Sequence, residues 1–287
     1  MSARTFFLSE AGALRAPWRI VGFIAAAGLC SFVAAALFGR PIEWLLVRMG
    51  VTGATNAYIA VIGALAAHAL MLKGVDRAPW QSAALGSEAA RPPKWLFGFV
   101  LGAIAIGVPI ALLIAAHWEA RQPAPAGSWA GAAFRVSALL LPAALLEELV
   151  TRGYVFAVLR QAAGAWVAVL ATSLFFGVMH LWNPGATVES TVLVTLAGVF
   201  LGVVVLATRS LYAAWMAHFA WNWTMAVVFH TAVSGLPVET PNYRYVDAGP
   251  DWLTGGPWGP EGGALAGVGM LSGLTYLIAR QKRRGEQ

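Results

Sequence analysis

Long apolar runs recur along this chain from Ile20 to Ile278, with no polar block between them long enough for a separate globular unit. A helix that crosses a bilayer needs about 20 mostly apolar residues. Charged residues make up only 11% of the sequence, whereas ordinary soluble domains carry about 25%. The sequence therefore predicts an all-α integral membrane protein with lipids as its surroundings.

The apolar runs predict about eight transmembrane helices that enclose an intramembrane polar cavity. We expect one polytopic domain over residues 1–287, with N-terminal helices within 18–116, a motif-bearing core at about 129–230, an outer loop at about 231–262 and a last helix at 263–280. The outer loop is rich in Gly, Pro and Trp, which favours a plain connector over a lid. The predicted spans are 18–38, 53–72, 95–116, 129–150, 164–182, 190–208, 210–230 and 263–280.

Lys and Arg in the short connections predict the orientation, because such residues are retained on the cytoplasmic side. Placing both termini in the cytoplasm puts most of these residues inside, including the terminal cluster from Arg280 to Arg284, and leaves Arg40, Arg48, Arg121 and Arg244 outside. The Ala-rich and Arg-rich composition and the short connections favour a bacterial inner membrane.

Several other classes of protein are disfavoured. The net charge of +6 is scattered over connections and one terminus, so we do not expect nucleic-acid binding. Cys30 is the single cysteine, which excludes an intramolecular disulfide. The first apolar run follows Arg4 and Arg15 as in a signal peptide, but it is long and lacks a clear cleavage site, so we expect a retained helix.

The stretch "LLEELVTRGY", residues 145–154, carries three charged residues inside an apolar run. A charge at the centre of a spanning helix costs about 2.5–3.5 kcal/mol on insertion scales. Glu148 and Arg152 are four residues apart, so they face each other across one helical turn and form a supporting ion pair. Glu147 is rotated by about 100° from Glu148 and has no such partner, which leaves its carboxylate free to react.

Further polar residues follow in later spans. His180 ends "LFFGVMH", and His218 and Asn222 share one helix face in "HFAWN". We assume that two antiparallel helices are joined by a turn near Ala163 and Gly164. Glu147 and His180 then each lie about 24 Å from that turn, and so at the same depth in the membrane. If the tip of this helix pair, which carries Arg160, protrudes into the cytosol, His218 lies at the same depth. The site would then open towards the cytoplasm. We expect the remaining histidines to form hydrogen bonds between helices instead: His68, His117 and His230.

These motifs resemble those of a known family. "EELVTR" is similar to the Glu-Glu-x-x-x-Arg motif of the CAAX protease and bacteriocin-processing family, also called the ABI family of intramembrane glutamic proteases. "FGVMH" and "HFAWN" resemble its Phe-x-x-x-His and His-x-x-x-Asn motifs, in the same order. The resemblance covers about residues 147–222 and implies an eight-helix membrane fold with a cytosol-accessible cavity and endopeptidase activity.

Peptide hydrolysis needs an activated water and donors for the developing oxyanion. An apolar cavity makes a carboxylate a stronger base than it is in water, so we assign water activation to Glu147, with His180 sharing or orienting that water. His218 and Asn222 then stabilise the oxyanion. The resemblance implies the same catalytic residues, with Glu148 and Arg152 in support and with no metal.

Two alternatives remain open. Two histidines and a glutamate are a common zinc-binding set, although the sequence has no His-Glu-x-x-His and Asn222 is a poor zinc ligand. A bacteriocin-immunity factor or a transporter would use the same polar residues without catalysis. The motifs do not distinguish substrates, which include peptides and proteins, and C-terminal or lipidated segments are among the options.

Overall fold

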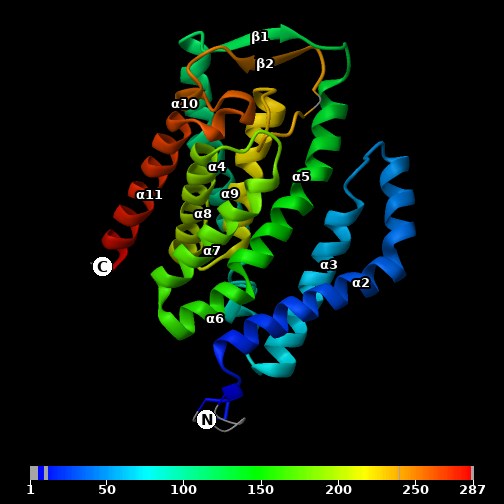
Figure 1. Cartoon of the computed structure of the whole chain (residues 1–287), viewed down its shortest axis with the longest axis vertical. Coiled ribbons are helices and arrows are strands. Elements are labelled where there is room, and N and C mark those ends of the chain that lie inside the picture. The colour runs from blue at the N-terminus through cyan, green and yellow to red at the C-terminus, as the bar shows by residue number, and fades with distance from the viewer. Residues whose placement is uncertain (1–5, 10–11, 239, 286–287) are drawn as a thin grey trace.

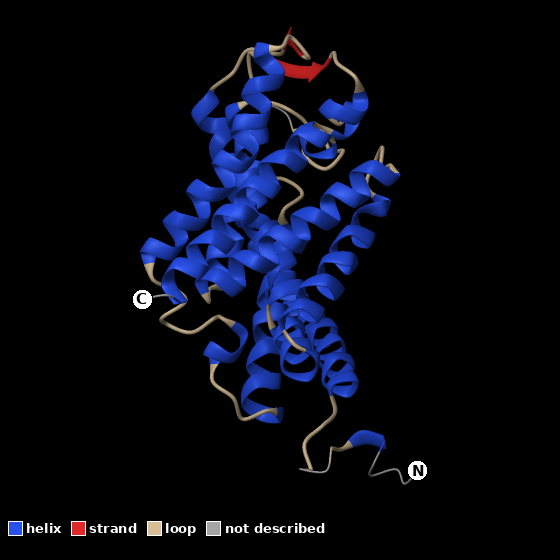
Figure 2. Cartoon of the chain, turned by 90° about the vertical axis from the view of Figure 1, so that its left-hand side faces the viewer, coloured by secondary structure: helices blue, strands red, loops and turns tan. Residues whose placement is uncertain are grey.

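The computed structural model describes residues 6–9, 12–238 and 240–285, and helices dominate them (Figure 1). Two short strands form the sheet that these residues contain, and it lies at one end of the molecule (Figure 2). Helix α2 begins near the opposite end, and the C-terminal helix runs away from the sheet. The prediction of an all-α membrane protein is confirmed.

Six helices of the described part are long and apolar enough to cross a membrane. The last two predicted spans are also helical, but α9 has only 13 residues before its π-helical extension η4, so the count of eight spans is approximate. The helices are α2 (Ala16–Arg48), α3 (Thr55–Ala69) with π-helical η1 (Leu70–Val75), α4 (Pro92–Ala115), α5 (Trp129–Arg152), α6 (Tyr154–Ala163), α7 (Ala165–Met179) with η3 (His180–Trp182), α8 (Val188–Thr208), α9 (Leu211–Trp223) with η4 (Thr224–Val228), and α11 (Ala264–Gly285).

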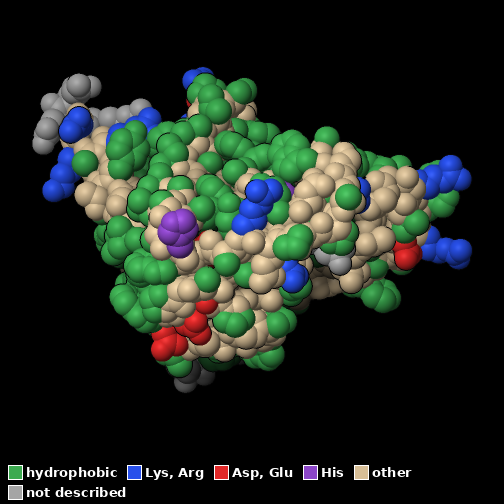
Figure 3. All heavy atoms as spheres, turned by 90° about the horizontal axis from the view of Figure 1, so that it is seen from above, with side chains coloured by type: hydrophobic (Ala, Val, Ile, Leu, Met, Phe, Trp, Pro, Cys, Tyr) green, Lys and Arg blue, Asp and Glu red, His purple; other side chains and the backbone are tan. Residues whose placement is uncertain are grey.

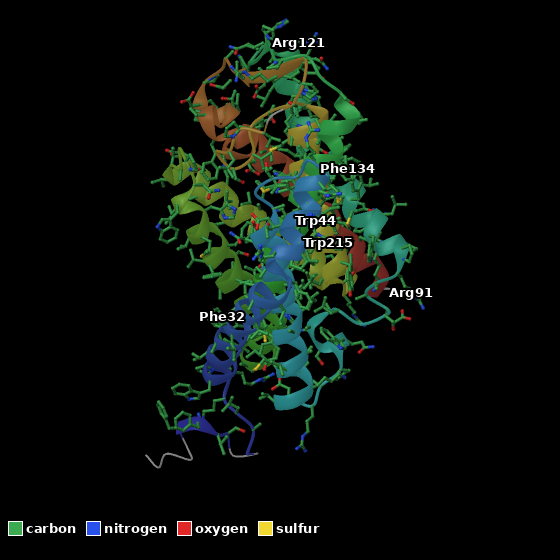
Figure 4. All side chains as sticks on the ribbon, turned by 90° about the vertical axis from the view of Figure 1, so that its right-hand side faces the viewer. Phe32, Trp44, Arg91, Arg121, Phe134 and Trp215 are labelled. Atoms are coloured by element: carbon green, nitrogen blue, oxygen red, sulfur yellow. The ribbon has the colours of Figure 1, made fainter. Side chains whose placement is uncertain are left out.

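Helix α2 presents large apolar side chains outward along most of its length. Phe32 is 73% exposed, and Leu29 and Ile24 are similarly exposed. Figure 4 shows Phe32 and Trp44 on this helix, which lies in front of the other helices in that view. Such an apolar surface suits contact with lipid chains. The largest buried cluster lies elsewhere, between α4, α5, α7, α8, α9 and α11.

Small residues bring α4 and α9 close together at the centre of the bundle. A Cβ atom added to Gly98 would overlap the carbonyl oxygen of Ala213, and one added to Gly102 would overlap that of Ala217. Small residues four apart on both helices allow such close backbone contact. Because Ala217 directly precedes His218, this contact fixes the position of that histidine along the bundle.

The chain changes direction at Gly153, between α5 and α6. A Cβ atom there would overlap His68 Nε2. The Tyr154 N–H donates to His68 Nε2 at 3.0 Å, and His68 Nδ1 donates to the Ala64 carbonyl at 2.7 Å. His68 therefore links α3 to α6 through a hydrogen bond, as predicted.

The segments predicted to lie outside the membrane are folded rather than irregular. Strand β1 (Glu119–Pro123) pairs antiparallel with β2 (Tyr243–Asp247), with Glu119 opposite Asp247. Figure 3 views the molecule from this end, where apolar side chains cover much of the visible face. The remaining short helices are η2 (Trp80–Ala83), α10 (Asp251–Thr254), η5 (Gly256–Trp258) and η6 (Pro260–Gly262).

Candidate active site

Three of the predicted site residues meet beside α5. The Glu147 carboxylate oxygen Oε2 lies 4.0 Å from His180 Nε2 and 3.8 Å from His218 Nε2. Glu147 projects from α5, His180 stands at the end of α7, and His218 lies on α9. Both distances exceed those of direct hydrogen bonds, so the three groups surround a point rather than pair with one another.

Each histidine is held through its other ring nitrogen. His180 Nδ1 lies 2.8 Å from the Phe176 carbonyl oxygen, and His218 Nδ1 lies 3.0 Å from Glu148 Oε1. The Phe176 carbonyl and the ionised Glu148 carboxylate have no hydrogen to donate, so Nδ1 is the donor in both rings. The bond at one ring nitrogen determines the orientation of the other. Both Nε2 atoms are thereby turned towards Glu147.

Glu148 and Arg152 form the ion pair that their spacing predicted. Their side chains are 0% exposed and their closest atoms are 3.2 Å apart. Arg152 also donates to Thr151 Oγ1 at 2.7 Å and to the Gly198 carbonyl at 3.0 Å. Because neither charge has access to water, each depends on the other for compensation.

The sequence interpretation did not include the contact between Glu148 and His218, nor a role for Phe176. The Arg152 guanidinium lies over the Phe176 ring, 4.5 Å from its centre, and this ring also contacts His180 and His218. Phe176 is the first residue of the Phe-x-x-x-His motif, so its position in that motif was the available signal.

A cavity of about 840 Å³ joins these residues. One face of α5 lines it from Ala132 to Thr151, which spans roughly 28 Å at 1.5 Å per residue. Asn222 lines it as well, one turn after His218. The Glu147 side chain is 38% exposed, and its Oε2 has no hydrogen-bond partner within the described chain. Glu147 therefore presents a free acceptor in a largely apolar cavity.

The cavity extends from Glu147 towards the sheet. Its wall includes residues 50–52 between α2 and α3, the start of α5, and residues 233–238, all on the side of the sheet (Figure 1). The termini were predicted to be cytoplasmic, and the site was predicted to open towards the cytoplasm. Both stay predictions.

The turn lies near Ala163 and Gly164 as predicted, but the helix before it is not continuous. Helix α6 ends at Ala163 and α7 begins at Ala165, with Gly164 at a φ of 93°. The estimate assumed one straight helix from Glu147 to that turn, however, and the chain breaks at Gly153. Glu147 and His180 meet because α5, α7 and α9 pack together, not because the tip of a helix pair protrudes.

The prediction of a plain connector for the outer loop is wrong. Ser234 lines the cavity, and its hydroxyl donates to Glu261 Oε1 at 2.6 Å. Glu261 Oε2 accepts from Trp221 Nε1 at 2.9 Å, which connects the loop to α9 directly before Asn222. A carboxylate in a loop of Gly and Pro was the only sequence signal for this link.

The described ranges contain no group of three or more His, Cys, Asp and Glu side chains arranged to hold a metal ion. The chemistry that these side chains can supply directly is proton transfer and hydrogen bonding.

The middle of the chain is similar to a known protein family. The family model of the type II CAAX prenyl endopeptidases, Rce1-like, matches residues 128–224. This segment is therefore similar to the Rce1-like family, and we call it the Rce1-like segment. The Rce1-like segment covers about a third of the chain and includes α5 to α9 with every predicted site residue. The predicted family resemblance is confirmed. The curated proteins and the solved structures contain no match to the chain.

Proposed function

We propose that this protein is an intramembrane endopeptidase that hydrolyses a peptide bond through a water activated by Glu147. The observation that carries the proposal is the convergence of one free carboxylate acceptor with two oriented imidazoles in the Rce1-like segment. The segment is similar to membrane endopeptidases of the CAAX-protease type, and the glutamate mechanism is our inference from the geometry.

In the proposed reaction, water donates a proton to Glu147 while its oxygen attacks the carbonyl carbon of the substrate. His180 Nε2 accepts the second hydrogen of that water and orients it. His218 acts in its cationic form, in which Nδ1–H keeps its bond to Glu148 while Nε2–H and the Asn222 amide donate to the oxyanion as the carbonyl bond opens. The C–N bond then breaks, and the departing amine takes the proton from Glu147. Each donor to the oxyanion is worth about 2.7–4 kcal/mol in other hydrolases.

The shape of the cavity supports a peptide substrate. An extended chain advances about 3.4 Å per residue, so the roughly 28 Å along α5 accommodates about eight residues. The wall is mostly apolar, with Arg135 at the end remote from Glu147. We therefore propose an extended, predominantly apolar peptide segment as the substrate.

Substitution of Glu147 by Gln tests the mechanism, because the amide keeps the shape and cannot accept a proton. We expect Glu147→Gln to lower kcat/KM by about 10²–10⁴-fold, the usual contribution of a general base. Cleavage of quenched fluorescent peptides of apolar sequence measures this, with the full chain in detergent micelles. Glu43→Gln, an exposed acid on α2, is the matched control and should keep full activity.

Two results would contradict the proposal. Full activity in Glu147→Gln would remove the carboxylate from the reaction. Loss of activity on exhaustive chelation, restored by zinc, would favour the metalloprotease alternative. If Glu147→Gln, His180→Ala and His218→Ala all lowered the melting temperature alike and the wild type cleaved no peptide, the polar cluster would be a brace, as in an immunity factor.

A further inference from the structure

A second cavity, of about 360 Å³, lies at the opposite end of α5 from the sheet. It is formed where η2, the junction of α5 with α6, and the C-terminal end of α8 come together. Its charged lining residues are Arg152, Arg160 and Arg209, and no described acidic residue lines it. The cavity is separate from the catalytic one, since the two share no lining residue.

Two of these arginines have no partner of their own in the described chain. Arg160 and Arg209 are exposed, and neither side chain makes a hydrogen bond or an ion pair with a described residue. The backbone N–H of Arg209 already closes α8 by donating to the Val205 carbonyl at 2.8 Å. Its guanidinium is therefore not needed to cap the helix.

Arg152 supplies an independent observation. It is 1% exposed, its two terminal nitrogens are engaged by Glu148, Thr151 and Gly198, and its Nε has no hydrogen-bond partner in the described chain. A buried charged donor that lacks a hydrogen bond destabilises the folded protein. An anion in the adjoining cavity would stabilise this cation from the side that Glu148 leaves uncovered.

We propose that this cavity binds a phosphate group. Arg160 and Arg209 would contact its oxygens through their guanidinium groups, and Arg152 would add positive charge from beneath. A guanidinium matches two phosphate oxygens at once, and the three terminal oxygens of a phosphate can serve more than one arginine. Basic pockets between membrane helices at a bilayer surface bind phospholipid head groups in this way.

The phosphate could come from an anionic phospholipid or from solution, and titration distinguishes the two. We would titrate the full chain in maltoside micelles, which contain no phosphate, with inorganic phosphate and separately with dihexanoyl phosphatidic acid, using isothermal titration calorimetry. Binding of inorganic phosphate would identify the phosphate itself as sufficient. Binding of the phosphatidic acid alone would identify a head group as the ligand.

The variants Arg160→Gln and Arg209→Gln test the site, because both side chains are exposed and their loss should not unfold the protein. We expect each to raise the Kd of the bound probe about tenfold and the double variant to abolish binding. Arg91→Gln, an exposed arginine paired with Glu88, is the control and should bind as the wild type does. Absence of binding of both probes to the wild type, or an unchanged Kd in the double variant, would overturn the proposal.

Discussion

Glu147 and Glu148 are neighbours in the sequence and occupy opposite environments. Glu148 is fully buried between Arg152 and His218, whereas Glu147 faces the cavity. The rotation of about 100° per residue separates them, so this difference and the Glu148–Arg152 pair could be predicted from one helix alone. The contact with His218 could not, because it depends on how α5 and α9 pack.

A double-mutant cycle tests the buried pair. We expect Glu148→Ala and Arg152→Ala each to lower the free energy of unfolding by about 3–5 kcal/mol, because each leaves an uncompensated buried charge. The double variant should lose less than the sum of the two. Denaturant unfolding in micelles measures all three variants.

The exposed pair of Glu88 and Arg91 provides the matched control. Its side chains are 65% and 64% exposed, so its coupling energy should be no more than about 1 kcal/mol. Additive losses at Glu148 and Arg152 would show that their contact does not stabilise the fold.

At the scale of elements, the helices were more predictable than the sheet. Each predicted span is helical in the structure, but the first was predicted too short, because α2 continues from the predicted end at residue 38 to Arg48. Strands β1 and β2 pair across more than a hundred residues, which no local pattern indicates. The break at Gly153 also escaped prediction, because the residue that requires it, His68, belongs to another helix.

The β1–β2 pair should be sensitive to pH. Burial, together with Asp247 on the facing strand, raises the pKa of the Glu119 carboxyl from 4.5 to about 7. Below pH 4.5 the carboxyl is protonated in the folded and unfolded chain alike. Between pH 4.5 and 7 the unfolded chain ionises first, so stability falls as the pH rises, by at most about 1.4 kcal/mol per pH unit.

Glu119→Gln should remove this dependence. The variant should melt at a higher temperature than the wild type at pH 8 and at a similar temperature at pH 4.5. Thermal unfolding in micelles at both values measures the difference, with the exposed Glu88→Gln as control. A wild type that becomes more stable from pH 4.5 to 7, relative to Glu119→Gln, would contradict the assignment.

At the scale of the whole molecule, the long cavity extends from the site towards the sheet end of the bundle. Three helices of the Rce1-like segment and the loop at residues 233–238 form its wall, so its direction depends on the complete fold. The motifs predicted which residues lie in the site. They did not indicate that residues 50–52, between α2 and α3, and residues 233–238 complete its wall at the sheet end.

The positive-inside rule and the cavity together lead to a topology that can be tested. Most Lys and Arg residues lie in the segments on the side of the termini, which favours cytoplasmic termini. The sheet and the end of the cavity nearest to it then face outward. Cys30 is the only cysteine, so a Cys30→Ala chain is a clean background for single cysteines at exposed positions. We choose Thr52→Cys at the cavity wall, Gln122→Cys on β1 and Gln281→Cys near the end of α11.

A membrane-impermeant maleimide should label Thr52→Cys and Gln122→Cys in intact bacterial cells, and Gln281→Cys only after the membrane is permeabilised. The reverse pattern would place the termini outside and turn the cavity towards the cytoplasm, against the charge rule. Labelling of Thr52→Cys and Gln122→Cys from opposite sides would contradict the fold itself, because the structure puts both at the same end. The three cysteines thus separate an error in orientation from an error in the arrangement of the helices.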